Sequence, residues 1–245
     1  MRDMQSIDWS SIKAVVFDVD GTLYTQSKMR KQMLFALLSY YLIRPWKIKE
    51  LKMLSDFRKE RESKAGFAGT DLENAQYEWC AQKGKYSTEK LKQVIEHWMF
   101  KFPNQYLSDC IYPGTKSFFE ALKKKGYLIA IYSDYKAEAK LKAMNLSADL
   151  IVASTDSHID RLKPDPKALN YIAKKFSLQP EECLFIGDRQ ELDGQCAINA
   201  GWPYLIVNKQ PFNSFSFYSN LENQLVDKAS YQDEISAEKP SLTAS

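Results

Sequence analysis

The feature that most constrains the fold is the apolar run Ala14–Phe17, which ends directly in Asp18-Val19-Asp20-Gly21. A continuous apolar run with β-branched residues is typical of a strand that is buried on both faces of a parallel sheet. The glycine that follows indicates a turn. We therefore expect a buried strand with two carboxylates at its carboxyl end.

Similar apolar runs recur along the chain, and helix-like stretches such as 115–125 separate them. Strands that alternate with helices are typical of a parallel sheet covered by helices. The chain has 245 residues, 44% of them hydrophobic, which is enough to bury such a core. We predict an α/β fold. The further strands are expected at 127–132, 150–153, 183–186 and 204–207.

Residues 26–105 interrupt this alternation, because they contain helical patterns but no strand-like run. We predict an inserted bundle of about four helices there. One apolar stripe with helical spacing comprises Leu91, Val94, Ile95, Trp98 and Met99. The predicted domains are a core made of 1–24 and 106–208, a helical insertion at 25–105, and a C-terminal extension at 209–245 whose polar composition predicts partial disorder.

Charge is unevenly distributed along the chain. The net charge of +3 is too mild to argue for nucleic acid or an anionic membrane as the principal partner. Residues 26–105 hold 16 Lys/Arg and 9 Asp/Glu, so the remainder is net acidic. A basic segment that faces an acidic one could draw an anionic substrate between them, with a cation on the acidic side. A solvated basic surface explains the same pattern equally well.

The cysteines and the longest apolar run bear on location. We predict reduced core cysteines and a cytoplasmic setting, because there is no C-x-x-C spacing and no cleavable signal before the first strand-like run. Residues 33–43 are too few for the ~20 that a spanning helix needs. We expect no stable membrane insertion, and we expect this run to be buried inside the helical insertion rather than to lie on a membrane surface. The cysteines are Cys80, Cys110, Cys183 and Cys196.

Polar side chains of catalytic types follow several of the predicted strands. Because open α/β sheets bind ligands at the carboxyl ends of their strands, these side chains can converge in one crevice. Clustered carboxylates repel one another unless a divalent cation and a lysine neutralise them. Oxygen ligands around a phosphate favour Mg2+. The candidate residues are Asp18, Asp20, Ser133, Asp134, Lys163, Asp188 and Asp193.

Taken singly, each candidate also has an ordinary structural explanation. A lone D-x-D-G can be a turn in which aspartates cap the backbone. Ser133 can cap a helix, Lys163 can be a surface lysine, and Asp188 can be an acid at a strand end. The order and spacing of all the segments therefore carry more weight than any one of them.

Four segments together resemble a known set of motifs. They are Phe17-Asp18-Val19-Asp20-Gly21-Thr22-Leu23, Tyr132-Ser133-Asp134, Leu162-Lys163-Pro164-Asp165-Pro166, and Gly187-Asp188-Arg189 through Asp193-Gly194. In order and spacing they resemble the motifs of the haloacid dehalogenase superfamily. The helical insertion directly after the first motif is similar to the mobile cap of its phosphoglycolate phosphatase-like branch. The resemblance implies a Rossmann-like parallel sheet core with an inserted all-helical cap domain.

The resemblance also implies a role for each candidate residue. Asp18 would be the nucleophile that attacks phosphorus, and Asp20 would be the general acid and base. Ser133, Asp134 and Lys163 would bind the substrate, with Ser133 and Lys163 stabilising the transferring phosphoryl group. Mg2+ would be held by Asp18, the backbone carbonyl of Asp20, Asp188 and Asp193, the last as a ligand or a partner of the ligands.

Asp20 decides the chemistry that we expect. Dehalogenases of the superfamily lack an acid/base carboxylate at this place, whereas its phosphatases and phosphomutases carry one. We predict a Mg2+-dependent phosphatase of a small phosphorylated metabolite that works through a phosphorylated aspartate. The alternatives are a phosphomutase that acts on a sugar phosphate and a non-catalytic binding protein. We expect the cap to hinge near 22–26 and 105–112. For the Lys and Arg residues in 28–64, notably Arg58, Lys59 and Arg61, a solvated helix face is the default interpretation, and contact with the substrate's distal part is the alternative.

Overall fold

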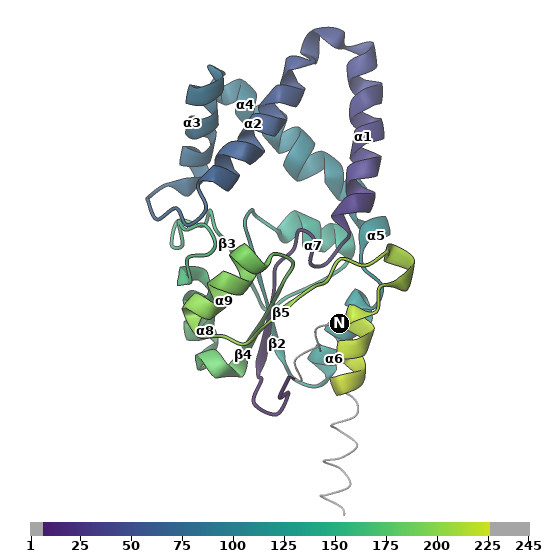
Figure 1. The fold of residues 1–245 in the computed structure, drawn as a ribbon, viewed down its shortest axis with the longest axis vertical. Helices are drawn as coiled ribbons and strands as arrows, with labels where there is room; N and C mark the ends of the chain where they lie inside the picture. Colours follow the sequence, from purple (N-terminus) through teal and green to yellow (C-terminus); the bar gives the residue numbers. More distant parts are fainter. Residues whose placement is uncertain (1–6, 226–245) are drawn as a thin grey trace, which may run out of the picture.

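The computed structural model describes residues 7–225. Within these residues all strands are parallel and form one sheet in the order β3-β2-β1-β4-β5 (Figure 1). Each strand lies where the apolar runs predicted it, so the predicted α/β class is confirmed. The strands are β1 Ala14–Phe17, β2 Leu128–Ser133, β3 Leu150–Ala153, β4 Cys183–Gly187 and β5 Tyr204–Ile206.

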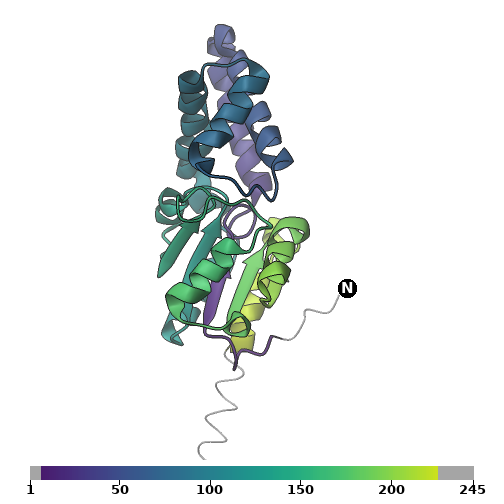
Figure 2. The same ribbon diagram turned by 90° about the vertical axis from the view of Figure 1, so that its left-hand side faces the viewer.

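Alternate residues of the strands face opposite sides of the sheet, and each side has its own hydrophobic cluster. Val15 and Phe17 pack with helices α6 and α7 on one side, whereas Ala14 and Val16 pack with α8 and α9 on the other. Figure 2 shows the helices on both faces. Burial on both faces explains why these strands are apolar throughout. The covering helices are α6 Thr115–Lys124, α7 Glu138–Met144, α8 Lys167–Phe176 and α9 Gln195–Ala200.

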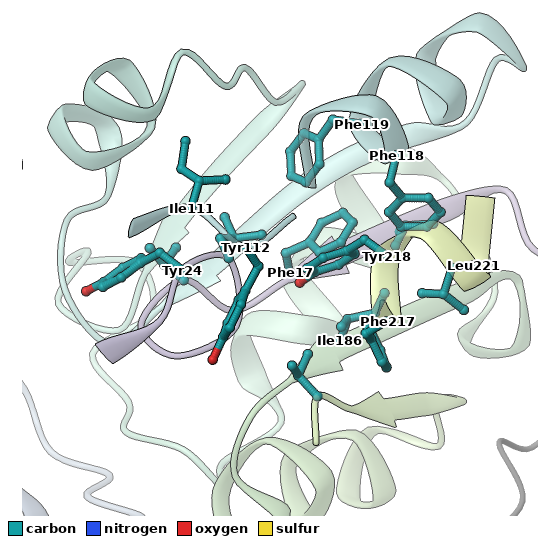
Figure 3. Packing of buried hydrophobic residues seen from close by; sticks show 14 of the residues in the cluster. Phe17, Tyr24, Ile111, Tyr112, Phe118, Phe119, Ile186, Phe217, Tyr218 and Leu221 are labelled. Atoms are coloured by element: carbon teal, nitrogen blue, oxygen red, sulfur yellow. The ribbon is translucent and has the colours of Figure 1, made fainter. Parts of the chain in front are cut away.

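The core does not end at residue 208 as the sequence predicted. Residues 217–225 are helical, and their Tyr218 is fully buried beside Phe17 (Figure 3). The prediction was wrong because polar residues separate the aromatic ones in this segment, and only contact with the sheet buries the latter. The rest of the predicted extension, 226–245, lies outside the described residues.

Helices occupy the predicted insertion, and this unit, called the cap below, stands over the carboxyl ends of the strands (Figure 1). The cap has a hydrophobic cluster of its own that includes Phe57, Cys80 and Leu91. The predicted apolar stripe lies on α4 and on the π-helical turn that continues it. The elements are α1 Gln26–Ile43, η1 Pro45–Lys47, α2 Lys49–Ser63, α3 Leu72–Gly84, α4 Thr88–Ile95, η2 Glu96–Lys101 and η3 Phe102–Tyr106, after which α5 Leu107–Cys110 leads back to the core.

The two linkers between cap and core run side by side. The N–H of Thr25 donates to the carbonyl of Cys110 at 2.9 Å, and the N–H of Tyr112 donates to the carbonyl of Leu23 at 3.1 Å. These contacts fall in the two ranges that the sequence analysis expected as hinges. The linkers therefore leave the core as a hydrogen-bonded pair.

The apolar run 33–43 is not buried inside the cap as we expected. Leu37 packs against the cap cluster, but Phe35, Leu38 and Leu42 of the same helix are exposed. The prediction failed because the run is apolar on all sides, so its pattern does not distinguish a packed face from an outer one. Within residues 7–225, no helix is both long and apolar enough to cross a membrane.

Candidate active site

The candidate site lies at the carboxyl ends of β1, β2 and β4. Phe17 is in register with Ile131 on one side and with Ile186 on the other, and the N–H of Asp18 donates to the carbonyl of Ile186 at 2.9 Å. After β1 the chain forms β2 and β3 toward one edge of the sheet, and it then crosses back to form β4 on the other flank of β1. Open α/β sheets bind ligands at such a switch point. Asp18 and Asp188 emerge there from adjacent strands.

Lys163 joins two of the predicted carboxylates. Its Nζ donates to Oδ1 of Asp18 at 2.7 Å and to Oδ1 of Asp193 at 2.8 Å, and the side chain is only 1% exposed. A buried ammonium is stable only when it is paired. Burial lowers the pKa of Lys163, but Asp18 and then Asp193 outweigh this and raise the pKa well above its ordinary value. Lys163 therefore remains charged.

Asp18, Asp188 and Asp193 form an acidic cluster in which one oxygen of each lies within 4.8 Å of the others. Burial raises the pKa of Asp18 to about 7, against the opposing charge of Lys163, and burial followed by repulsion from Asp193 raises the pKa of Asp188 to about 6. The Oδ1 atom of Asp188 is buried without a hydrogen-bond partner. A divalent cation would relieve the repulsion and coordinate this oxygen, so the donor set fits Mg2+.

Asp193 and Gly21 shape the loop that carries Asp188. Oδ2 of Asp193 accepts the N–H groups of Asp188 at 3.1 Å and Arg189 at 2.9 Å. Gly21 has a φ of +98°, and a Cβ there would lie 2.3 Å from Oδ2 of Asp188. The first motif therefore needs glycine both for its turn and for the close approach of Asp188.

Asp20 lies apart from this acidic cluster. Nζ of Lys140 donates to both of its carboxylate oxygens at 2.6 Å, and the hydroxyl of Tyr24 donates to its Oδ1. Burial raises the pKa of Asp20, but Lys140 outweighs it, and the pKa lies below its ordinary value. The backbone carbonyl of Asp20, which we expected to bind the metal, accepts a hydrogen bond from Nε2 of Gln26 at 2.8 Å.

Ser133 is the last residue of β2, and Asp134 follows it; β2 and β4 are the two neighbours of β1 in the sheet. The buried hydroxyl of Ser133 accepts the N–H of Tyr135 at 3.4 Å. The carboxylate of Asp134 pairs with Nη2 of Arg189 at 2.9 Å. Burial raises the pKa of Asp134, but Lys163 and then Arg61 outweigh it and hold this pKa below the ordinary value. Asp134 thus links the second motif to the fourth.

The cap contacts the backbone of the site. Arg61 donates to the carbonyl of Asp134, and its guanidinium lies 4.1 Å from the ring centre of Tyr135. The N–H of Gly66 donates to the carbonyl of Lys163 at 3.0 Å. Arg61 was among the cap cations for which contact with the substrate was the alternative to a solvated helix face. It reaches the edge of the site, and the structure pairs it with the core.

Sequence reasoning missed the residues that hold Asp20. Lys140 lies on α7, and no spacing rule marks it, because only the rotation of that helix over the crevice directs its side chain to Asp20. Tyr24 lies four residues after Asp20 in the first motif's flank, which is the only signal that could have drawn attention to it. Arg189 was part of the quoted fourth motif, but no role was expected for it.

Comparison with known proteins identifies the class to which this fold and site belong. Residues 12–201 match the family model described as haloacid dehalogenase-like hydrolase. Because the match spans most of the chain, the protein belongs to this family. The family expected from the motifs is confirmed.

Individual proteins of known name are also similar to this chain. The chain is 30% identical over 112 residues to the phosphoglycolate phosphatase of Haemophilus influenzae (strain 86-028NP), a match that covers 44% of this chain and 50% of that one, so the chain spans about half the length of this relative. A longer match is to the phosphoglycolate phosphatase of Mannheimia succiniciproducens, which is 26% identical over 186 residues. This match covers 73% of this chain and 78% of that one. The crystal structure of β-phosphoglucomutase from Clostridium difficile has a TM-score of 0.57 at 18% identity and covers 89% of this chain and 99% of that one, which is a likeness of fold.

Proposed function

We propose that this protein is a Mg2+-dependent phosphatase that hydrolyses a small phosphorylated metabolite through a phosphorylated aspartate. The observation that carries the proposal is the buried pairing of Lys163 with Asp18, which is part of the acidic cluster with Asp188 and Asp193. A carboxylate can attack phosphorus, and the acyl phosphate that forms is readily hydrolysed. The similarity to phosphoglycolate phosphatases supports the same reaction class.

In the first half-reaction, Asp18 attacks phosphorus and the leaving alcohol takes a proton from Asp20. The Asp18 carboxylate is oriented for this, because Oδ2 accepts the hydroxyl of Thr22 at 2.9 Å and Oδ1 accepts Lys163. Lys163 and the hydroxyl of Ser133 stabilise the charge on the transferring oxygens. In the second half-reaction, Asp20 takes a proton from the water that displaces phosphate from Asp18.

Lys140 places a condition on this mechanism. A general acid must carry a proton, and the ion pair with Lys140 favours the charged form of Asp20. The pair must therefore open when the substrate binds. A phosphate dianion can compete for Lys140, because an ammonium binds phosphate oxygens as strongly as it binds a carboxylate.

Asp18 and Asp188 would hold Mg2+, and Asp193 would orient both through Lys163 and the loop that follows β4. The bound ion would neutralise charge that develops on the phosphoryl oxygens. Without it, Asp18 would face two further carboxylates and only one lysine in contact. This imbalance supports the proposed need for a divalent cation.

The test is phosphate release from a panel of phosphomonoesters, with Mg2+ and with a chelator. Asp18→Asn should abolish release, and Asp20→Asn should lower it by about 10²-fold or more, the usual contribution of a general acid–base. Asp20→Asn should also accumulate the phosphorylated chain, visible as a phosphoryl mass gain in intact-protein spectra. Glu120→Gln, the same kind of change on the exposed face of α6, is the control and should behave as the parent.

A different product would point to a different function. Transfer of the phosphoryl group to a sugar alcohol rather than to water would show that the protein is a phosphomutase and not a phosphatase. No phosphoryl transfer from any ester, with the folded state verified, would leave only a binding role.

A further inference from the structure

A cavity of about 510 Å³ lies between the cap and the candidate catalytic residues. Tyr24, Tyr135 and Lys140 line the end of it that faces the core. Tyr24 and Lys140 are the same residues that hold the carboxylate of Asp20. If Asp20 protonates the leaving alcohol, the rest of that alcohol extends into this cavity.

The walls of the cavity are mostly apolar. Helices α1 and α2 and the turn η2 supply large side chains, among them Met33, Leu37, Leu51, Leu54, Trp98 and Met99. None of the described residues that line it is acidic. The lining includes the cations Arg30, Arg58 and Lys59 but few neutral polar side chains. The hydroxyls of a sugar placed here would find donors in these cations but few acceptors, because no described lining residue carries a carboxylate, and a buried hydroxyl that cannot donate is costly.

A two-carbon acid would leave most of this cavity unfilled. Pockets of roughly 300–1,000 Å³ typically hold drug-sized ligands. Oδ1 of Asn104, which lines the cavity, is buried without a hydrogen-bond partner. It can accept a hydrogen bond from one donor group of a ligand that is otherwise apolar.

We propose that the natural substrate is a phosphomonoester whose alcohol carries an apolar body, alkyl or aromatic, that fills this cavity. The proposal rests on the proposed phosphatase function and specifies its substrate class. It sets this chain apart from its phosphoglycolate phosphatase relatives, whose named substrate is small and polar.

The test uses primary alkyl phosphates from ethyl to hexyl, because their leaving alcohols have nearly the same acidity. With Mg2+ present, kcat/KM should rise about fourfold per added methylene, the gain expected when each CH₂ leaves water. A flat series, or a preference for phosphoglycolate or sugar phosphates, would overturn the proposal while the phosphatase function stands. Calorimetric binding of the matching alkylphosphonates tests the cavity even if no ester is hydrolysed, and affinity that is independent of chain length would also overturn it.

Two neighbouring positions of α1 provide a matched pair of variants. Leu37→Asn puts an amide into the cavity wall and should remove most of the advantage of hexyl over ethyl phosphate. Leu38→Asn makes the same change on the outer side, where the side chain is 59% exposed, and should leave the series unchanged. Equal effects of both variants would contradict a role for the cavity.

A second observation concerns the exposed side chains of α1 and of the turn that follows it. Of the large apolar side chains that are exposed in residues 7–225, all but Ile198 lie on α1 and the turn that follows it (Figure 1). Exposed apolar patches of this kind mark interaction sites. We call this surface the apolar tip; it comprises Leu34, Phe35, Leu38, Leu42, Ile43, Trp46 and Ile48, which are 53–84% exposed.

The charge near the apolar tip indicates which kind of partner it binds. Residues 34–49, which include the whole apolar tip, contain the cations Arg44, Lys47 and Lys49 and no Asp or Glu. A two-fold dimer would bring this surface against itself, and like charges oppose that contact. Apolar side chains with a tryptophan and surrounding cations are typical of segments that lie in the interface of anionic membranes. We infer that the apolar tip docks on an anionic lipid surface without crossing it.

Vesicle co-sedimentation tests this inference. The protein should bind vesicles that contain phosphatidylglycerol, bind pure phosphatidylcholine vesicles much less, and be released by salt. Phe35→Asp should weaken binding by about tenfold or more, because it removes apolar area and adds a repelled charge. Ile198→Asp, on the exposed side of α9, is the control and should bind as the parent.

Several results would overturn the lipid assignment. These are equal binding to both kinds of vesicle, no binding to either, or the same behaviour of both variants. Sedimentation that reveals a dimer which Phe35→Asp dissociates would assign the apolar tip to a second copy of the chain instead.

Discussion

At the level of single residues, the buried carboxylates of the site have few cationic partners. One ammonium, that of Lys163, contacts both Asp18 and Asp193. Asp188 keeps a buried oxygen without a hydrogen-bond partner. The three carboxylates have Lys163 in contact and the guanidinium of Arg189 farther away, with its Nε 4.0 Å from Oδ1 of Asp188. A local excess of negative charge remains, and this excess should govern how the metal-free protein responds to pH.

We predict that the metal-free protein becomes less stable as pH rises from 4 to 8. The folded pKa values of Asp18 and Asp188, about 7 and about 6, lie above the ordinary value of 3.8. Between these values the unfolded chain has already lost its protons, so stability present at pH 4 is lost as pH rises through the folded pKa values. The lowered pKa values of Asp20 and Asp134 act only below the ordinary value, outside this window.

Thermal melts at each pH check this, with a chelator and with Mg2+. The midpoint should fall by at least about 4 °C without metal, given ~2–4 °C per kcal/mol for a chain of this size, and Mg2+ should restore it at pH 8. Asp188→Asn should reduce both effects. A midpoint that stays level or rises from pH 4 to 8 in chelator would contradict the prediction.

Among the elements, the helical segment 217–225 supports the first motif although it is distant in sequence. The hydroxyl of Tyr218 donates to the carbonyl of Thr22 at 2.7 Å, and the hydroxyl of Thr22 in turn donates to Asp18. Both contacts are buried. The segment that the sequence assigned to a polar extension thus holds the loop that orients the candidate nucleophile.

Tyr218→Phe should lower the unfolding free energy by about 1–3 kcal/mol, because it leaves the buried carbonyl of Thr22 without its partner. It should also lower kcat more than it changes KM, since the orientation of Asp18 depends on Thr22. Denaturant unfolding and steady-state kinetics measure the two effects. Tyr171→Phe, at a half-buried position on α8, is the matched control. Equal stability of the two variants would remove the support that we assign to Tyr218.

At the scale of the whole molecule, several contacts hold the cap on the core besides the paired linkers and Arg61. In the loop 64–72, the N–H groups of Asp71 and Leu72 donate to the carboxylate of Asp160 at 3.1 Å and 2.9 Å. Gly66 of the same loop binds the carbonyl of Lys163. Figure 1 shows this loop against the core on the opposite side from α1. Opening of the cap must break these contacts.

Asp160→Gly should loosen the cap on the core. Asp160 has a φ of +49°, which glycine adopts freely, so the variant removes both hydrogen bonds without straining the backbone. Hydrogen exchange of the Gly66 and Leu72 amides should accelerate by about tenfold or more, the equivalent of one to two lost hydrogen bonds. Asp160→Asn keeps one acceptor oxygen and tolerates this φ, and should lie close to the parent. Unchanged exchange in the glycine variant would show that other contacts hold the loop.

Local sequence patterns predicted those strands and helices whose faces are each either fully buried or fully exposed. The strands around Asp18 were recognised because burial on both faces makes them apolar throughout, and the stripe from Leu91 to Met99 was recognised because one face of its helix is buried. The outer face of α1 was misjudged because Leu37 and Leu38 are the same residue type. Their different burial comes from the direction of the helix over the cavity.

The sequence by itself determined the α/β core, the position of the helical insertion and the residues that follow the central strands, because each depends on short-range periodicity and on motif order. The tertiary structure decided the rest: that Lys140 and Tyr24 hold Asp20, that Tyr218 supports the first motif, that the cap leaves an apolar cavity above the site, and that the apolar tip is exposed. These features depend on contacts between segments up to almost two hundred residues apart, such as Tyr218 with Thr22. No local pattern encodes such a contact, because it arises only when helices and strands pack in three dimensions.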